Sequence, residues 1–249
     1  TRPWVEEFDS IVFELSNETW NRMFTPWIWP TMIDQATGKQ YRGSGSSWGE
    51  VYGIFQEYVC GILRSSPYWT PELEEKFVFH IGGFTKWDYG WNAAKYSPST
   101  ELITHAAYNG GWDEGEGPPQ PSPPSYFNVL SQVYQSAINV ANINKERMIE
   151  FNAGREVQAR LGTYEAGPGY AMNGLNNARV TPEQARGQEE VMKSMAAGTA
   201  TLDSFLARAA HGYVVDNFFT FNEGHRWRSH AKWYRGGQVA TLDPERGER

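Results

Sequence analysis

The chain has little cysteine, no long apolar segment and no excess of basic residues. Its single cysteine, Cys60, excludes an internal disulfide framework and a zinc site built from cysteines. No apolar run approaches the roughly 18 residues that a membrane helix requires, so we expect no membrane span. The 22 lysines and arginines stand against 29 acidic residues, which gives a net charge of −7. This balance argues against a nucleic-acid partner, because a basic face is needed to meet phosphates.

Aromatic residues, in contrast, are abundant. Tryptophan, tyrosine and phenylalanine number 11, 13 and 13 and together form 15% of the sequence, whereas charged residues form only 20%. Disordered chains have few aromatics and many charges, so this composition predicts a globular protein. The length of 249 residues suits a single (β/α)8 barrel, and we expect one domain over residues 1–249.

Short β-branched and aromatic runs alternate along the chain with longer segments that have helical spacing. The predicted strands are residues 11–15, 77–81, 102–107, 157–164 and 214–221. The predicted helices are residues 48–63, 87–96, 126–151 and about 181–210. Strands that alternate with helices in this way predict an α/β fold with a parallel sheet.

Two glutamates lie at the ends of predicted strands, which is where function sits in such folds. The first strand ends in SNETWN, which contains Glu18, and the fourth ends in TYEAGPGY, which contains Glu165. Because parallel strands end at the same edge of a sheet, we expect the two carboxylates there together. Hydrolysis of a glycosidic bond needs this pair: one carboxyl group as acid and another as nucleophile or base.

The residues around both glutamates resemble a known family. IVFELSNETWN is similar to the strand-four segment of clan A glycoside hydrolases, in which an Asn-Glu pair ends the strand, and LGTYEAGPGY is similar to the strand-seven segment. The resemblance implies a TIM (β/α)8 barrel and a retaining mechanism with Glu18 as acid/base and Glu165 as nucleophile. It also implies that Asn17 binds the sugar 2-hydroxyl, that Tyr108 contacts the nucleophile, and that Trp227 forms the floor of the site.

The resemblance departs from the family at the start of the chain. If residues 11–15 form strand four, the chain supplies about five βα units, strands four to eight, and lacks the N-terminal strands. An open five-stranded barrel leaves edges and apolar interior exposed. We therefore expect a fragment of a longer polypeptide, or a partner that supplies the missing part of the barrel or belongs to a larger assembly.

Further substrate-binding candidates are aromatic, histidine and acidic residues near the strand ends. Sugar rings stack on flat aromatic faces, and seven tryptophans fall in loops or helix starts after strands, although packing under long loops is the alternative. These tryptophans are Trp20, Trp27, Trp29, Trp87, Trp91, Trp112 and Trp227. The other candidates are His80, His105, Tyr170 and Glu223, of which Glu223 is also a rival nucleophile. A histidine inside a strand is more often a core residue, and we expect at least one of His80 and His105 to line the site.

We expect no cofactor and no metal. His225 and His230 with Glu223 match no zinc spacing, and the acidic loop with Asp113, Glu114 and Glu116 is interpreted as solvated rather than calcium-binding. Glu14 is interpreted as a strand residue paired with a basic group. The predicted function is a retaining glycosidase that cleaves a poly- or oligosaccharide, for which a secreted or cell-surface location is favoured. The alternatives are a non-catalytic glycan-binding barrel and a structural component of a larger assembly.

Overall fold

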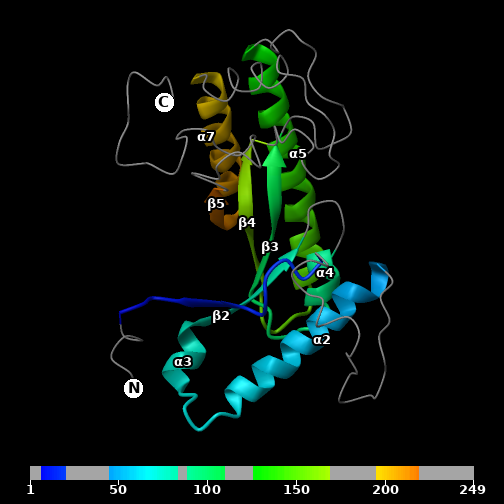
Figure 1. Cartoon of the computed structure of the whole chain (residues 1–249), viewed down its shortest axis with the longest axis vertical. Coiled ribbons are helices and arrows are strands. Elements are labelled where there is room, and N and C mark those ends of the chain that lie inside the picture. Colours follow the sequence, from blue (N-terminus) through cyan, green and yellow to red (C-terminus); the bar gives the residue numbers. More distant parts are fainter. Residues whose placement is uncertain (1–6, 21–44, 84–88, 110–125, 169–194, 219–249) are drawn as a thin grey trace, which may run out of the picture. The chain divides into compact units, whose positions relative to one another are not determined.

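The computed structural model describes residues 7–20, 45–83, 89–109, 126–168 and 195–218, and every structural statement below concerns these residues. The described residues form five strands and five helices, whose arrangement can be followed in Figure 1. The strands are β1 (Ile11–Glu14), β2 (Phe77–Gly83), β3 (Leu102–Asn109), β4 (Arg160–Pro168) and β5 (Tyr213–Phe218). The helices are α2 (Gly45–Arg64), α3 (Pro71–Lys76), α4 (Tyr89–Ala94), α5 (Tyr126–Asn152) and α7 (Met195–Ala210).

The strands form one sheet in the order β1-β2-β3-β4-β5. β1 pairs with β2 in parallel, and β2 pairs with β3 in parallel. The spatial order follows the chain order, as in a (β/α)8 barrel, whereas a doubly wound sheet reverses its order at a switch point. The predicted fold class is confirmed: this is an α/β fold with five parallel strands that alternate with helices, like part of a TIM barrel.

The predicted elements are confirmed within a few residues, and one helix is added. α3 is absent from the predicted elements, although Thr70 and Pro71 form a helix start of the usual kind. The Thr70 hydroxyl accepts a hydrogen bond from the Leu73 N–H at 3.3 Å, and proline occupies the first helical turn. The part of the predicted helix at residues 181–194 lies outside the described residues.

The chain forms two compact units, which are described separately below. Unit 1 comprises Thr1–Ala106 and Arg147–Gly162, and unit 2 comprises Ala107–Glu146 and Thr163–Arg249. The borders fall inside β3, α5 and β4, so that each of these elements belongs partly to each unit.

In unit 1, one face of β1 and β2 is covered by aromatic residues and by α2. Phe13 of β1 lies opposite Phe79 of β2, with ring centroids 6.1 Å apart. The Phe79 ring also stacks with Trp69 at 6.2 Å, and the Arg64 guanidinium of α2 lies 4.9 Å from its centroid. Side chains alternate along a strand, so the neighbours of Phe13 and Phe79 project from the opposite face.

Helices α2 and α4 of unit 1 approach each other through glycine. A Cβ atom on Gly53 of α2 would lie 1.9 Å from the carbonyl oxygen of Ala93 in α4. No side chain fits in that space, so only glycine permits this contact. The close approach places α2 and α4 on the same region of β2 and brings Tyr52 and Tyr89 within reach of each other.

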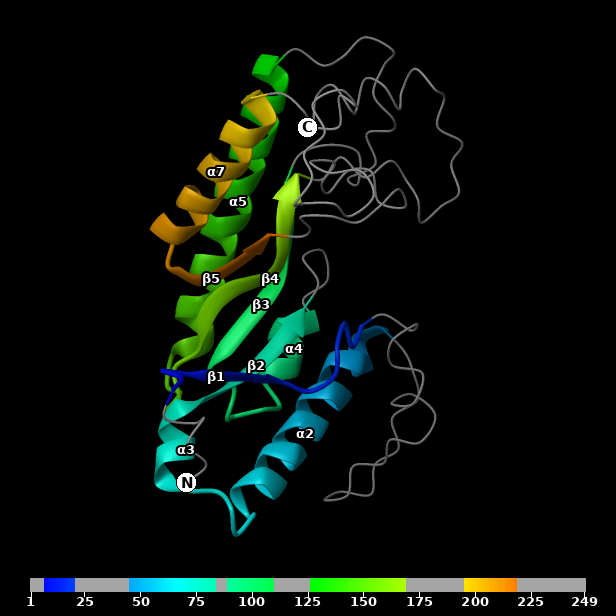
Figure 2. The same ribbon diagram turned by 60° about the vertical axis from the view of Figure 1, so that its left-hand side comes forward.

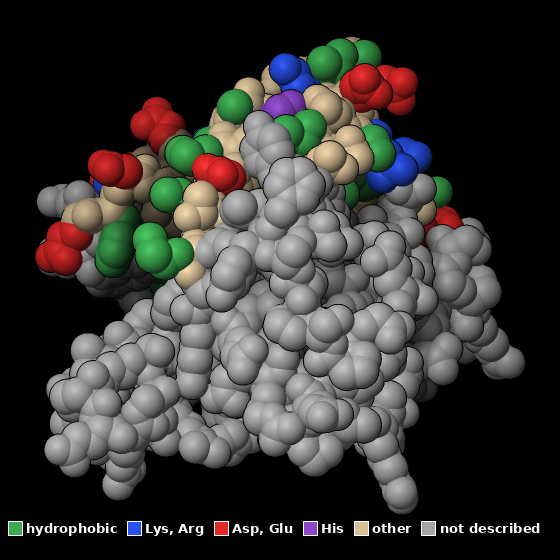
Figure 3. All heavy atoms as spheres, turned by 90° about the horizontal axis from the view of Figure 1, so that it is seen from above, with side chains coloured by type: hydrophobic (Ala, Val, Ile, Leu, Met, Phe, Trp, Pro, Cys, Tyr) green, Lys and Arg blue, Asp and Glu red, His purple; other side chains and the backbone are tan. Residues whose placement is uncertain are grey.

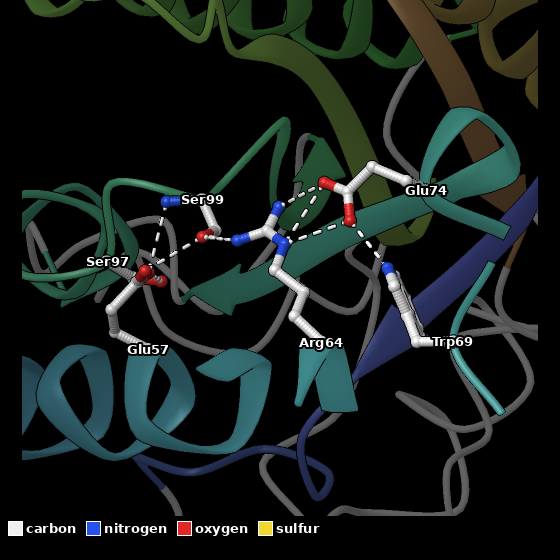
Figure 4. A network of polar contacts seen from close by, with 6 residues as sticks. All are labelled: Glu57, Arg64, Trp69, Glu74, Ser97 and Ser99. Carbon is white, nitrogen blue, oxygen red and sulfur yellow. Dashed lines mark hydrogen bonds and ion pairs between the residues drawn. The ribbon is translucent and has the colours of Figure 1, made fainter. Parts of the chain in front are cut away.

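A polar network lies at the amino ends of β2 and β3 (Figure 4). Glu57 of α2 accepts hydrogen bonds from the Ser97 hydroxyl at 3.0 Å, the Ser99 N–H at 3.0 Å and the Ser99 hydroxyl at 2.8 Å. Arg64 donates to both carboxylate oxygens of Glu74, with an Nη2–Oε1 distance of 2.7 Å and an Nε–Oε2 distance of 3.1 Å. The network thus connects α2 and α3 to the loop before β3, at the end of the sheet opposite the carboxyl ends of the strands.

Unit 2 is organised around a buried arginine. Arg208 of α7 is only 1% exposed, and its Nε donates to Asp216 Oδ2 of β5 at 2.7 Å. The Thr163 hydroxyl of β4 donates to Asp216 Oδ1 at 2.5 Å, and the Asn217 N–H donates to Thr163 Oγ1 at 3.1 Å. These bonds join α7, β4 and β5, and α7 runs beside β5 in Figure 2. The Phe205 ring, 4.8 Å from the guanidinium, adds a cation–π contact.

The described surface is of mixed character. Figure 3 shows acidic, basic and hydrophobic side chains interspersed over the described part of one face. Within the described ranges, we found no helix with the length and apolar character needed to cross a membrane.

We predict that Glu57 stabilises unit 1 more than its exposed acidic neighbours do. Replacing Glu57 by alanine removes the acceptor of three hydrogen bonds and leaves the serine donors unpaired, which should cost about 2 kcal/mol of unfolding free energy. Urea unfolding of Glu57→Ala and of the control Glu75→Ala, a substitution at an exposed position in α3, measures the difference. Equal stability of the two variants would contradict the structural role of the network.

We also predict strong coupling between Asp216 and Arg208. Asp216→Ala leaves a buried guanidinium without its carboxylate partner, and breaking such a pair typically costs about 3–5 kcal/mol. Arg208→Met should relieve part of this cost when it is combined with Asp216→Ala, because no charge is then buried. A double-mutant cycle by urea unfolding tests this, and additive losses would disprove the coupling.

Candidate active site

The turn after β1 carries the first candidate glutamate in an unusual backbone conformation. β1 ends at Glu14, and Ser16 and Glu18 both have positive φ angles, 68° and 41°. Residues other than glycine rarely adopt this region, and they keep it only where the surrounding structure holds them there. Glu18 is half-buried and Asn17 is exposed. The two predicted site residues are therefore presented by a strained turn directly after the strand.

Two buried residues anchor this turn in unit 1. Thr19 is 1% exposed, and the Trp20 ring meets the Tyr89 ring of α4 edge to face at 5.9 Å. Tyr89 in turn stacks on Tyr52 of α2 at 6.0 Å. The buried Thr19 side chain lies beside both tyrosines. The close contact between α2 and α4 thus creates a socket, formed by Thr19, Tyr52 and Tyr89, that holds the end of the turn.

Burial favours the uncharged form of the two socket tyrosines. It raises the pKa of Tyr52 well above its usual value, and the negative charge of Glu14 raises it further. Burial likewise raises the pKa of Tyr89. A tyrosine is uncharged at neutral pH in any case, and burial extends the protonated form of both phenols to more alkaline pH.

A row of polar side chains crosses three strands on the face opposite the aromatic cluster. Glu14 of β1 lies opposite His80 of β2, and Gly82 of β2 lies opposite Thr104 of β3, so all four residues share one face. The Glu14 Oε2 atom is 3.6 Å from His80 Nδ1. The other ring nitrogen, His80 Nε2, contacts the Thr104 hydroxyl.

His80 is a neutral member of this row. The side chain is buried, and burial lowers the pKa of His80 to about 4, so the contact with Glu14 is not an ion pair at neutral pH. His80 therefore lies as an uncharged imidazole between the Glu14 carboxylate and the Thr104 hydroxyl.

The two candidate histidines lie on opposite faces of the sheet. His105 follows Thr104 in β3, so its side chain projects away from the row that contains His80. His105 is buried, and its Nδ1 lies 2.9 Å from the carbonyl oxygen of Ala106. Of the two histidines, His80 is the one that shares a face with Glu14.

The second candidate glutamate belongs to unit 2. Glu165 is half-buried in β4, which ends at Pro168. It is two residues beyond Thr163 and therefore projects from the same face. Since Thr163 is held by Asp216, which Arg208 binds, this part of β4 is fixed by the buried network of unit 2.

The other predicted site residues are described only in part. Tyr108 lies in β3, and Trp20 is buried against Tyr89. Trp91 meets Phe151 edge to face at 5.8 Å, so both of these tryptophans pack against an aromatic neighbour. The predicted residues that lie outside the described part of the chain are Trp27, Trp29, Trp87, Trp112, Asp113, Glu114, Glu116, Tyr170, Glu223, His225, Trp227 and His230.

The structure brings residues together at this site that no sequence pattern connects. Thr19, Tyr52 and Tyr89 come from a turn and two helices, and their meeting depends on the packing of α2 against α4. Among the described residues, no group of three or more His, Cys, Asp or Glu side chains is arranged to hold a metal ion. Comparison with protein-family models, with curated proteins and with solved structures gave no significant match.

We predict that His80 makes unit 1 less stable in acid. The pKa of His80 is about 4 in the folded chain and about 6.5 when unfolded, so below pH 6.5 the unfolded chain binds a proton that the folded chain does not. Stability should therefore fall by about 3 kcal/mol from this residue as the pH drops from 6.5 to 4. Urea unfolding between pH 7 and pH 4 should show a shallower decline for His80→Asn, and an unchanged decline would refute the assignment.

Proposed function

We propose that the chain is a retaining glycoside hydrolase that cleaves a poly- or oligosaccharide with Glu165 as nucleophile and Glu18 as acid/base. The observation that carries the proposal is the placement of the two glutamates. Glu18 lies in the turn that follows β1, and Glu165 lies near the carboxyl end of β4, in a parallel sheet whose order is that of a (β/α)8 barrel. In such folds the functional groups come from the carboxyl ends of several strands. The resemblance of both segments to clan A glycoside hydrolases supports the same roles.

The proposed reaction proceeds in two displacements. Glu165 attacks the anomeric carbon and forms a glycosyl ester, while Glu18 gives its proton to the departing glycosidic oxygen. Water then attacks the same carbon, Glu18 takes a proton from that water, and the ester bond to Glu165 breaks. Configuration is retained because the anomeric carbon is inverted twice. Asn17, which is exposed beside Glu18, is proposed to bind the sugar 2-hydroxyl.

The local structure of each glutamate supports a functional role. The positive φ of Glu18 is a conformation that proteins tend to keep where function requires it, and the buried Thr19 and Trp20 hold the turn in place. Glu165 is presented by a strand that the Arg208 network fixes. Catalytic groups need supports of this kind, since a displacement of about 1 Å costs much of the rate.

We predict that activated 2-deoxy-2-fluoroglycosides will label Glu165. The fluorine slows both displacements, and the dinitrophenolate leaving group restores the rate of the first one only, so the glycosyl ester accumulates and mass spectrometry of peptides locates it. A panel of sugars identifies the one accepted. Glu165→Gln should remain unlabelled and inactive, while the control Glu156→Gln, at an exposed position before β4, should be labelled as in the wild type.

Glu18→Gln should lower the hydrolysis of an unactivated oligosaccharide by about 10²- to 10⁴-fold, which is the usual contribution of general acid–base catalysis. Full hydrolysis by Glu165→Gln would sink the proposal. Binding of glycans by the wild type without labelling or turnover would favour the non-catalytic binding module instead.

A further inference from the structure

Glu14 occupies a space that a glycine leaves open. It is the last residue of β1, and its side chain is 27% exposed. A Cβ atom on Gly82 of β2 would lie 2.4 Å from Glu14 Oε1 and 3.7 Å from Trp20 Cζ3. The carboxylate of Glu14 therefore lies directly over Gly82, with the Trp20 ring beside it. Any larger residue at position 82 would push the carboxylate away.

The same carboxylate is held from the side by the polar row. His80, opposite Glu14 in the strand register, faces it with Nδ1 at 3.6 Å, and the Thr104 hydroxyl fixes the other ring nitrogen. Gln56 of α2 donates to the His80 carbonyl oxygen at 2.9 Å, which fixes the backbone of the histidine as well. Glu14 thus meets a rigid neighbour from β2.

Glu14 also borders the socket that anchors the turn of Glu18. The negative charge of Glu14 raises the pKa of Tyr52, and the Trp20 ring lies next to the Glu14 carboxylate over Gly82. Tyr52 and Trp20 both contact Tyr89, and the buried Thr19 side chain lies beside both tyrosines. The carboxylate is therefore the point at which the polar row of the sheet meets the socket above it.

We propose that Glu14 is a positioning residue for Glu18: the Thr104–His80 row fixes its carboxylate over Gly82, and there it supports Trp20 and the socket that holds the turn of Glu18. This role rests on the proposed function, in which Glu18 is the acid/base. Glu14 does not touch the reacting atoms. Its replacement by glutamine keeps the volume of the side chain but removes the negative charge that His80 faces.

The role predicts a selective defect in the steps that use Glu18. Cleavage of a dinitrophenyl glycoside needs no protonation of the leaving group, whereas cleavage of a phenyl glycoside does. For Glu14→Gln we expect kcat/KM on the phenyl glycoside to fall about tenfold to a hundredfold, the effect of a displacement of about 1 Å, while kcat/KM on the dinitrophenyl glycoside stays within about twofold. Both glycosides carry the sugar that the labelling panel identifies.

Substitutions at two further positions test the placement of the Glu14 carboxylate: Gly82 below it, and Thr104, which contacts His80. Gly82→Ala should displace Glu14 and give the same split between the substrates. Thr104→Val should give a milder split through His80, and Thr104→Ser should restore wild-type behaviour because it keeps the hydroxyl. Glu75→Gln, at an exposed position in α3, is the control and should leave both rates unchanged. Circular dichroism verifies that each variant is folded.

The outcomes separate this role from the proposed function. An equal fall on both substrates in folded Glu14→Gln would show general damage to the site and overturn the positioning role. Unchanged rates on both would overturn it as well, while leaving the glycosidase proposal intact. A wild type that hydrolyses neither glycoside and takes no label would overturn the proposed function and this role with it.

Discussion

The register of β1 on β2 is the constraint on which the rest of unit 1 depends. Phe13 is placed opposite Phe79 and Glu14 opposite His80, so the two faces of the strand pair receive opposite characters. The apolar face accepts the aromatic cluster and α2, and the polar face carries the row that ends at Thr104. A slip of one residue would turn phenylalanine to the polar row and glutamate to the helices. The burial of Phe79 thus also decides where Glu14 points.

The buried polar side chains around the candidate acid/base, Glu18, are neutral hydrogen-bonding groups. His80, Tyr52 and Tyr89 are all buried, and burial opposes a charge on each of them. A charged group in the same places would cost several kcal/mol to desolvate unless it were paired. Neutral side chains can instead fill the space, satisfy one another and hold the turn. The acidic side chains of this region, Glu14 and Glu18, are only partly buried.

Sequence patterns predicted the elements well, because each element has a local cause. The run FVFHIGG has the β-branched and aromatic content of a buried strand, and β2 covers it. The short helix α3 was missed, although Thr70 and Pro71 carry the capping chemistry that marks other helix starts. Strand ends likewise pointed to Glu18 and Glu165. The face on which each side chain lies follows only from the strand register. The sequence alone therefore did not distinguish His80, which shares a face with Glu14, from His105, which does not. The socket of Thr19, Tyr52 and Tyr89 had no local signal at all, since it arises where α2 meets α4.

Two carboxylates of unit 1, those of Glu57 and Glu14, lie at opposite ends of the sheet and differ in how they are bound. The difference suits Glu57 to stabilising the fold and Glu14 to its proposed positioning role. At the amino ends of the strands, Glu57 accepts three hydrogen bonds from two serines, so its carboxylate is committed to the loop before β3. At the carboxyl end, Glu14 meets a neutral imidazole at a distance longer than a hydrogen bond. A carboxylate that is committed to fixed donors strengthens the fold but is poorly placed to exchange protons or to respond to a substrate. Glu18 lies instead in a strained turn whose end is anchored by buried residues, and acid–base chemistry requires such a fixed position for the group that transfers the proton.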